Sequence, residues 1–192
     1  MRPQRIALID LDSTIADYEK AMTRDLKKLM GPDEQFVFPS FGVVVPDYVM
    51  ERVKMIRQIP GWWRNLEPIE SGFKIVNILR DFGYDINVLT ACPSSAFNSA
   101  TEKYEWCAKY LPYATVSTSK NKFLMYGRLL FDDRSAYVTE WLARRPNGLA
   151  IVPAKEWNKD LVHPQVIKWD GSNIYEVVLR IKENSEGTET IT

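Results

Sequence analysis

The feature that most constrains the fold of this chain is a short apolar run that ends in two aspartates. Ile6–Ile9 is apolar at every position, which is typical of a central strand in a parallel sheet covered by helices on both faces. Asp10 and Asp12 follow at the carboxyl end of this strand, where open α/β folds bind their ligands, and in an extended chain they point the same way. Two carboxylates so close repel each other unless a cation or a shared proton relieves them, which predicts a divalent metal. The alternative is an Asx turn or a helix N-cap.

Three later segments extend the pattern. The apolar strand expected at 86–89 leads to the hydroxyl of Thr90, and the strand expected at 129–132 ends in the acid pair Asp132-Asp133. A polar stretch between them carries Lys120 and Lys122. The order is therefore two aspartates, a hydroxyl, a lysine and an acid pair, three of these parts at strand ends. With this four-part signature the chain resembles the haloacid-dehalogenase-like phosphohydrolase superfamily.

Several stretches narrow the resemblance to the 5′(3′)-deoxyribonucleotidase branch. Lys122 stands ten residues before Asp132, a spacing that the branch shares. The segments that look like the branch are 10–18, 65–68, 102–106 and 130–134.

The similarity extends from about Arg5 to about Trp169, with two departures. The branch usually has Gly where Ser13 stands, and a Ser-Pro pair where this chain reads Ala91-Cys92-Pro93 after Thr90. The second departure removes a hydroxyl that would contact phosphate, and so bears on substrate preference.

The resemblance implies a Mg²⁺ site and a covalent mechanism. The hard Mg²⁺ ion prefers oxygen ligands, and it would offset the repulsion between a phosphate dianion and an attacking carboxylate. Its ligands would be Asp10, the backbone carbonyl of Asp12, and the pair Asp132 and Asp133, of which we favour Asp132 as the direct ligand.

The same resemblance assigns the catalytic and phosphate-binding roles. Asp10 would be the nucleophile that forms an aspartyl-phosphate, and Asp12 would be the general acid and base. The phosphoryl oxygens would be held by Thr90, Ala91 and Lys122. Lys120 is the rival of Lys122, and the spacing to the acid pair favours Lys122.

A nucleotide substrate is expected from the aromatic residues. Tyr18, Trp62 and Trp63 fall where the related nucleotidases place the rings that wall the base pocket. Lys103 and Lys120 complete the predicted substrate-binding set. The alternative is that the adjacent tryptophans pack the chain together, which we expect of one of the two.

The periodicity of the chain predicts an α/β fold, a Rossmann-like three-layer parallel sheet with a small, mainly helical cap inserted after the first strand. The predicted core is 1–17 and 67–182, the cap 18–66, and a flexible tail 183–192. Ser71 is the expected N-cap of a helix that Gly83 ends. The expected helices are 16–30, 47–58, 71–82, 96–110 and 136–143, and the expected strands after the first are 86–89, 114–117, 129–132 and 149–152.

Composition favours a compact enzyme of one domain. The 192 residues are 45% hydrophobic, and 25 basic residues balance 25 acidic ones, which gives no basic field for a nucleic acid polymer or a membrane surface. No apolar stretch approaches the roughly 20 residues that span a bilayer. Cys92 and Cys107 have no metal or redox spacing, and we expect a cytoplasmic compartment and structural thiols. His163, the single histidine, is expected in a surface loop, which argues against serine–histidine chemistry.

The sequence therefore predicts a Mg²⁺-dependent phosphomonoesterase that releases phosphate from (deoxy)ribonucleoside monophosphates. One alternative is a phosphatase of the same fold with another small phosphomonoester as substrate. Another is an inactive relative that binds nucleotides, against which the four retained acids argue. A homodimer is left open.

Overall fold

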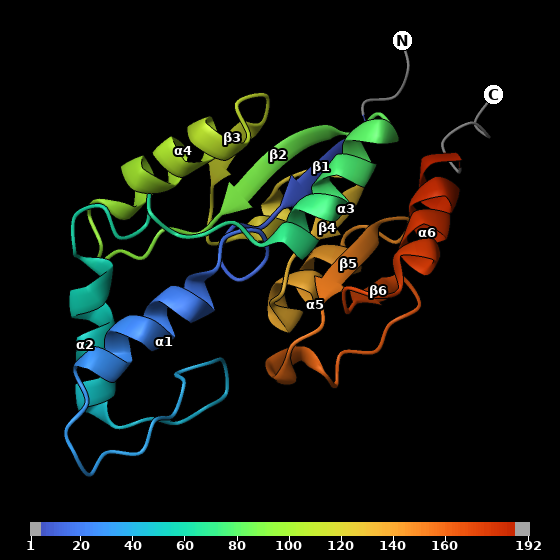
Figure 1. Cartoon of the computed structure of the whole chain (residues 1–192). Helices are drawn as coiled ribbons and strands as arrows, with labels where there is room; N and C mark the ends of the chain where they lie inside the picture. Colours follow the sequence, from blue (N-terminus) through green and yellow to red (C-terminus); the bar gives the residue numbers. More distant parts are fainter. Residues whose placement is uncertain (1–4, 187–192) are drawn as a thin grey trace.

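The structure, a computed structural model, describes residues 5–186 of the chain. Its centre is a six-stranded parallel sheet in the order β3-β2-β1-β4-β5-β6 (Figure 1). The strands are β1 (Ile6–Ile9), β2 (Asp85–Thr90), β3 (Thr115–Thr118), β4 (Leu129–Phe131), β5 (Leu149–Pro153) and β6 (Val166–Trp169). The helices are α1 (Tyr18–Lys28), α2 (Asp47–Arg57), α3 (Glu70–Asp81), α4 (Ser99–Tyr110), α5 (Ser135–Ala143) and α6 (Ile174–Glu186), with short 3₁₀ turns η1 (Lys122–Leu124) and η2 (Glu156–Asn158).

Helices cover both faces of the sheet, which explains why β1 is apolar throughout. Ala7 and Ile9 belong to the hydrophobic cluster that includes α3, α4 and α6, whereas Leu8 belongs to the opposite cluster with Trp141 of α5. All three β1 residues are fully buried. The predicted three-layer parallel sheet is confirmed, with β1 between β2 and β4 at its centre.

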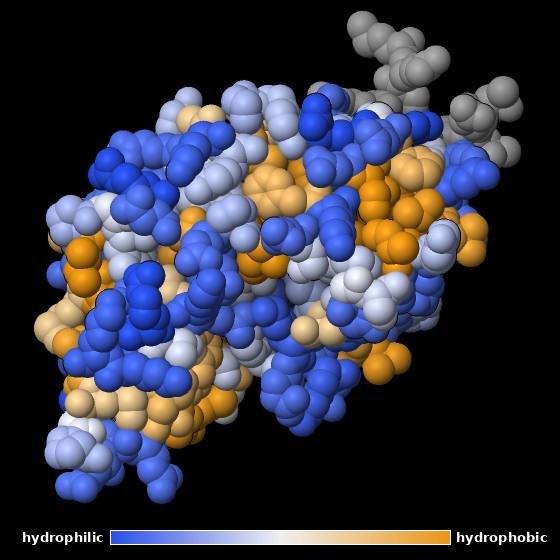
Figure 2. Space-filling model, viewed as in Figure 1, coloured by the Kyte–Doolittle hydropathy of each residue, from blue (hydrophilic) through white to orange (hydrophobic). Residues whose placement is uncertain are grey.

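Residues 18–66, called here the inserted segment, separate β1 from α3. Their two helices α1 and α2 contact each other and lie beyond one end of the sheet (Figure 1). Met22 and Ile56 are buried in the same cluster as one face of the sheet, so the segment packs continuously with the core. Hydrophobic side chains also reach the surface over this segment, at the lower left of Figure 2. Exposed examples are Val37, Val44, Tyr48, Met55 and Ile59.

The expected strands and helices are present with small shifts at their ends, and three details differ. Ser71 is not an N-cap, because α3 begins at Glu70 and its cap position is Ile69. β6 and α6 were not predicted from the sequence. The tail predicted at 183–192 is helical up to Glu186, and 187–192 lie outside the described residues.

Gly72, in the first turn of α3, allows this helix to approach the loop that follows β1. A Cβ atom built on Gly72 would lie 2.3 Å from the backbone oxygen of Thr14 and 3.2 Å from the Cα atom of Ile15. The Ile69 backbone N–H donates to the Ile15 carbonyl at 2.8 Å in the same contact. Only glycine permits this approach, and the approach fixes the loop that carries the first two aspartates.

Gly72→Ala should therefore lower the free energy of unfolding by about 1–3 kcal/mol, because backbone atoms must move to admit the methyl group. Urea denaturation measures this directly. The matched control is Gly31→Ala, where the nearest atoms to a new Cβ are in the Glu34 side chain at 3.8 Å. Equal stability of the two variants would contradict the close approach.

Candidate active site

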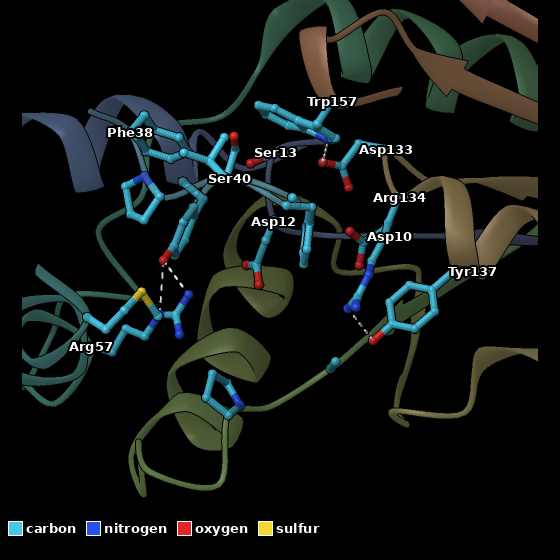
Figure 3. A pocket seen from close by; sticks show the side chains of 18 of the residues that line it. Asp10, Asp12, Ser13, Phe38, Ser40, Arg57, Asp133, Arg134, Tyr137 and Trp157 are labelled. Atoms are coloured by element: carbon cyan, nitrogen blue, oxygen red, sulfur yellow. Dashed lines mark hydrogen bonds between the residues drawn. The ribbon is translucent and has the colours of Figure 1, made fainter. Parts of the chain in front are cut away.

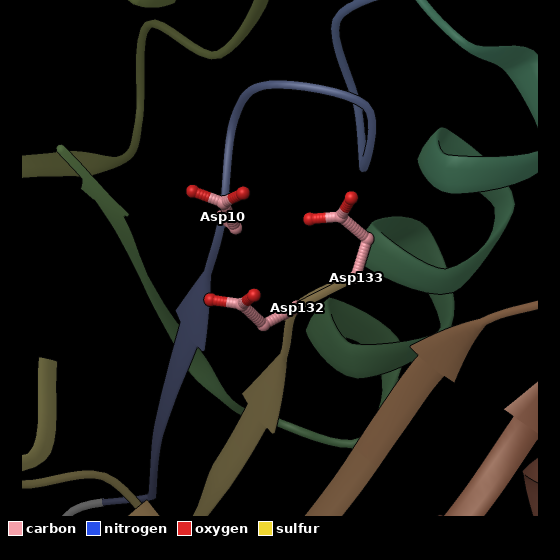
Figure 4. Close-up of side chains that lie close together, drawn as sticks. All are labelled: Asp10, Asp132 and Asp133. Carbon is pink, nitrogen blue, oxygen red and sulfur yellow. The ribbon is translucent and has the colours of Figure 1, made fainter. Parts of the chain in front are cut away.

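Three carboxylates meet at the carboxyl end of the two central strands. Ile9 of β1 pairs with Phe131 of β4, so the residues that follow, Asp10 and Asp132, are neighbours across the sheet. The Asp10 backbone N–H donates to the Phe131 carbonyl at 2.8 Å, which extends the pairing by one residue. One oxygen from each of Asp10, Asp132 and Asp133 lies within 4.8 Å of the others, and all three residues are buried (Figure 4).

Lys122 lies between two of these acids. The turn η1 brings its Nζ atom to 2.5 Å from Asp10 Oδ1 and 2.6 Å from Asp132 Oδ2, with the lysine side chain 1% exposed. Burial alone would lower the pKa of Lys122, but the two carboxylates raise it above its usual value. The lysine is therefore fixed as a cation in the cluster. The preference for Lys122 over Lys120 agrees with this placement, because Lys120 is exposed and does not line the cavity described below.

The positive charge of Lys122 does not fully compensate the burial of Asp132 and Asp133. Burial raises the pKa of Asp132 to about 6, although Lys122 opposes the shift. Burial also raises the pKa of Asp133 well above its usual value, and the charges of Asp10 and Asp132 add to the effect. A buried cluster of oxygen donors that carries more negative charge than one lysine balances fits a hard divalent cation such as Mg²⁺.

Asp12 is held apart from this cluster by a buried lysine of α4. Lys103, which is fully buried, donates from Nζ to Asp12 Oδ2 at 2.6 Å, to the Ala91 carbonyl at 2.8 Å and to Thr90 Oγ1 at 3.1 Å. Asp12 Oδ1 is buried and has no hydrogen-bond partner among residues 5–186. Burial raises the pKa of Asp12, and Lys103 opposes the shift. The side chain thus has one oxygen held by Lys103 and one buried oxygen that has no partner among the described residues.

The loop between Asp12 and α1 contains a strained residue, Ser13. Ser13 has φ 61°, the left-handed region that only glycine adopts without cost. A glycine, which the branch usually has at this position, would adopt this conformation without strain. The Ser13 backbone N–H donates to the Ala16 carbonyl at 2.8 Å, which closes the turn.

A cavity of about 450 Å³ opens over these groups (Figure 3). Its catalytic end contains Asp10, Asp12 and Asp133, and its opposite wall comes from the inserted segment. The remaining lining residues are Ser13, Tyr18, Phe38, Pro39, Ser40, Phe41, Gly42, Val43, Met50, Arg57, Trp63, Ala91, Pro93, Lys122, Arg134, Tyr137 and Trp157.

The predicted aromatic residues form one cluster, but only part of it reaches the cavity. Tyr18 stacks on Trp63 with ring centroids 5.8 Å apart, and both line the cavity. Trp62 meets both rings edge-on and does not line the cavity; its Nε1 donates to Asp25 at 3.0 Å. The expectation that one of the two tryptophans is a packing residue therefore fits Trp62.

Glu102 of α4 anchors the end of the inserted segment. Its carboxylate accepts the backbone N–H of Gly61 at 2.7 Å and that of Trp63 at 3.1 Å. Burial would raise the pKa of Glu102, but hydrogen bonds from Asn98 and these two N–H groups outweigh it, and the pKa is lowered. This role was not predicted, although Glu102 stands next to Lys103 in a segment that carries the resemblance.

Several other cavity residues were not predicted from the sequence. Trp157 Nε1 donates to Asp133 Oδ2 at 3.2 Å. The Arg134 side chain lies 4.2 Å from the ring of Phe41 and 4.4 Å from that of Tyr137, to whose hydroxyl it donates at 2.9 Å. Arg57 approaches from α2. No spacing in the sequence marks these residues, because they come from α2, α5, η2 and irregular segments that meet only in the folded chain.

The two cysteines and the histidine stand outside the acid cluster. His163 is exposed in a loop, where its Nδ1 accepts the Gln165 backbone N–H at 3.1 Å. Burial raises the pKa of Cys107 to about 12, so this thiol is not a nucleophile at neutral pH. Cys92 is half-buried and does not line the cavity. Within the described residues, the cluster of Asp10, Asp132 and Asp133 therefore includes neither a cysteine nor a histidine.

Comparison with known proteins identifies the family. The model of the family described as "5' nucleotidase, deoxy (Pyrimidine), cytosolic type C protein" matches residues 4–184. The chain belongs to this family. A Bordetella bronchiseptica protein whose name includes "5'(3')-deoxyribonucleotidase" is 26% identical over 173 residues, which cover 85% of this chain and 91% of that protein. The Homo sapiens "5'(3')-deoxyribonucleotidase, cytosolic type" is 24% identical over 141 residues, 66% of this chain and 69% of its own length.

Solved structures give the same fold. A Deinococcus radiodurans HAD family hydrolase, whose crystal structure has bound phosphate and sodium, aligns over 100% of both chains with a TM-score of 0.56 and 10% identity. The resemblance to the haloacid-dehalogenase-like superfamily and its deoxyribonucleotidase branch is thus confirmed, and the family is one of phosphatases. No helix within residues 5–186 is long and apolar enough to cross a membrane.

The raised carboxyl pKa values predict an unusual dependence of stability on pH. Between pH 4 and 6 the folded chain holds a proton on Asp132 that the unfolded chain releases, because the folded pKa is about 6 and the ordinary value is 3.8. Without divalent metal, this group makes the folded state more stable as the pH falls through this window, and less stable as it rises. Mg²⁺ at pH 7.5 should raise the melting temperature, and the increase should shrink toward pH 5 as protons compete with the cation.

Thermal melts in EDTA and in Mg²⁺ across pH 5–8 measure the pH dependence of stability and the increase in melting temperature that Mg²⁺ causes. Both effects should diminish in Asp132→Asn. Asp160→Asn, at an exposed site, is the control that keeps them. A Mg²⁺-induced increase in melting temperature that is the same at pH 5 and pH 7.5 would contradict the assignment of the cation to this cluster.

Proposed function

We propose that the protein is a Mg²⁺-dependent phosphomonoesterase that hydrolyses (deoxy)ribonucleoside monophosphates through an aspartyl-phosphate. The observation that carries this proposal is the buried cluster of Asp10, Asp132, Asp133 and Lys122 at one end of a cavity whose other end is aromatic. The family and the names of the relatives support the substrate class.

The metal would be held by the three clustered carboxylates, with the backbone carbonyl of Asp12 as a further ligand. Both oxygens of Asp132 already accept hydrogen bonds, from Lys122 and from the Arg134 backbone N–H at 2.8 Å. The Asp133 side chain accepts a hydrogen bond from Trp157 on one of its oxygens. Of the acid pair, this difference favours Asp133 over Asp132 as the residue that binds the metal directly. From the sequence we expected Asp132. Bound Mg²⁺ would supply positive charge to the phosphoryl oxygens and to the attacking carboxylate.

Asp10 and Asp12 would take different parts in the reaction. An oxygen of Asp10 attacks phosphorus, and the bond between phosphorus and the leaving oxygen breaks as Asp12 donates a proton to that oxygen. Asp12 then takes a proton from a water molecule that attacks the aspartyl-phosphate, which frees Asp10 and releases phosphate. Asp12 Oδ1 has no hydrogen-bond partner in the described part of the chain and the pKa of this carboxyl group is raised, and both properties suit the first of these steps. Lys103 holds the other oxygen of Asp12 in place.

The phosphoryl oxygens would meet Thr90, Ala91 and Lys122. Two of the three N–H groups of Lys122 are used by carboxylates, which leaves one for a phosphoryl oxygen. The Thr90 hydroxyl accepts from Lys103 and so can still donate its own proton. Lys103 itself is fully buried, and in this proposal it positions Asp12 rather than touching the substrate, which differs from its predicted substrate-binding role.

The inserted segment, residues 18–66, would act as the cap that excludes water and binds the nucleoside. Tyr18 and Trp63 would wall the base, whereas Trp62 supports them from behind. The cavity is large enough for a mononucleotide and not for a polymer, which agrees with the balanced charge of the chain. A cytoplasmic location is proposed from the word "cytosolic" in the names of the family and of the human relative. The homodimer stays a prediction.

Asp10→Asn should lower phosphate release by roughly 1000-fold or more while the protein stays folded, because it removes both the attacking oxygen and a metal ligand. The assay is a phosphate-release panel of ribo- and deoxyribonucleotides, sugar phosphates and an aryl phosphate, with Mg²⁺ or EDTA. Asp160→Asn is the matched control with unchanged activity. Retained turnover in Asp10→Asn would reject the covalent mechanism, and activity on sugar phosphates alone would reject the nucleotide substrate.

The adjacent tryptophans provide a second test. Both are buried, but only Trp63 lines the cavity. Trp63→Leu should lower kcat/KM for a deoxynucleotide by about 5- to 150-fold, the equivalent of a lost stack worth ~1–3 kcal/mol, relative to its effect on an aryl phosphate. Trp62→Leu should affect both substrates equally. The same ratio of the two activities in both variants would mean that Trp63 only packs the segment.

A further inference from the structure

A polar pair lies at the end of the cavity opposite the acids. The Arg57 guanidinium donates from Nε at 2.9 Å and from Nη2 at 2.6 Å to the hydroxyl of Tyr18 (dashed lines in Figure 3). Both residues line the cavity and both belong to the inserted segment, Arg57 at the end of α2 and Tyr18 at the start of α1.

This pair presents only hydrogen-bond donors to a ligand. Within residues 5–186, Arg57 has no acidic side chain at ion-pair distance. A guanidinium has five N–H groups and no acceptor, and two of these groups are used by Tyr18. The Tyr18 hydroxyl accepts both of them, so its own proton is left to donate. Burial raises the pKa of Tyr18 to about 12, which keeps that proton in place.

The surroundings of the pair select a flat, uncharged ligand with acceptors at its edge. Tyr18 and Trp63 supply stacked aromatic rings, and the nearby cavity walls include Phe38, Val43 and Met50. A second phosphate would need further cations to leave water, and Arg57 is the only cation that the inserted segment contributes to the lining. A heterocyclic base needs only a stacking surface and hydrogen bonds to its edge.

Arginine donors discriminate strongly between the two purines. The edge of guanine that carries O6 and N7 offers two adjacent acceptors, which a guanidinium binds in bidentate fashion. The corresponding edge of adenine offers N7 and an N6 amino group, whose protons face the arginine protons without an acceptor. Both purines have the same ring system, so stacking alone does not separate them.

We propose that Arg57, together with Tyr18, reads the base edge and selects guanine over adenine among purine nucleotides. This inference rests on the proposed nucleotidase activity and adds the residue that sets base preference. The wild-type protein should therefore hydrolyse 2′-deoxyguanosine 5′-monophosphate with a kcat/KM about 10-fold or more above that for 2′-deoxyadenosine 5′-monophosphate.

The deciding measurement is this guanine-to-adenine ratio of kcat/KM in variants of α2. Arg57→Met should bring the ratio close to 1, and Arg57→Lys, which keeps the charge but loses the planar fork, should lower it several-fold. Lys54→Met removes one positive charge from the exposed side of the same helix and should keep the wild-type ratio. The activity on an aryl phosphate, which has no base, normalises each variant for any loss of folded enzyme.

A second readout requires no chemistry on the nucleotide. Deoxyguanosine should inhibit aryl phosphate hydrolysis more strongly than deoxyadenosine in the wild type, and the difference should vanish in Arg57→Met. A wild-type ratio near 1, or an unchanged ratio in Arg57→Met, would overturn the inference. So would a loss in Arg57→Met confined to a nucleoside 3′,5′-bisphosphate, since this would place a second phosphate at Arg57. A wild-type enzyme that hydrolyses the aryl phosphate but no nucleotide would instead reject the proposed function.

Discussion

The buried contact of Lys122 with Asp10 and Asp132 is the interaction on which the site depends. It joins the ends of β1 and β4, two neighbouring strands, to the short turn η1 that precedes β4. Burying carboxylates is costly unless a cation pairs with them, and a single lysine does not balance Asp10, Asp132 and Asp133. The fold therefore maintains a local excess of negative charge at one end of an otherwise apolar sheet. That excess is what makes the site suitable for a divalent cation.

A second lysine, Lys103, pairs with Asp12, whereas Lys122 pairs with Asp10. Lys103 reaches from α4 to Asp12, Thr90 and Ala91, and its Nζ lies 4.5 Å from the ring centre of Trp63. Asp12 is thereby held in a network distinct from that of Asp10, although the two stand one residue apart. The same helix anchors the inserted segment through Glu102. α4 thus connects Asp12 and the aromatic wall of the cavity, so the proposed general acid and the proposed base pocket share one helix as their support.

The inserted segment contributes a wall of a different chemical character. It brings aromatic and aliphatic side chains and one arginine to a cavity whose other end is dominated by carboxylates. The contact of Arg134 with the ring of Phe41 joins the loop between α1 and α2 to the region that follows β4. In the proposed function the sheet provides the chemistry that a phosphate ester requires, and the inserted segment contributes most of the apolar wall that would meet the rest of the ester.

The sequence alone predicted the strands β1 to β5 and the acids at the ends of β1 and β4, because each of these is a local pattern. Apolar runs mark the strands, and the residue after a strand in a parallel sheet must lie at its carboxyl edge. The pattern therefore predicted that Asp10 and Asp132 meet at this edge, whereas the preference for Lys122 rested on a spacing that the resembling branch shares. Only the tertiary structure decided that Lys103 is buried against Asp12, that Trp63 and not Trp62 lines the cavity, and that Arg57 meets Tyr18. These contacts join helices and loops whose relative position depends on packing across the whole inserted segment. A one-dimensional pattern carries no record of that packing, since neither spacing nor periodicity relates the residues involved.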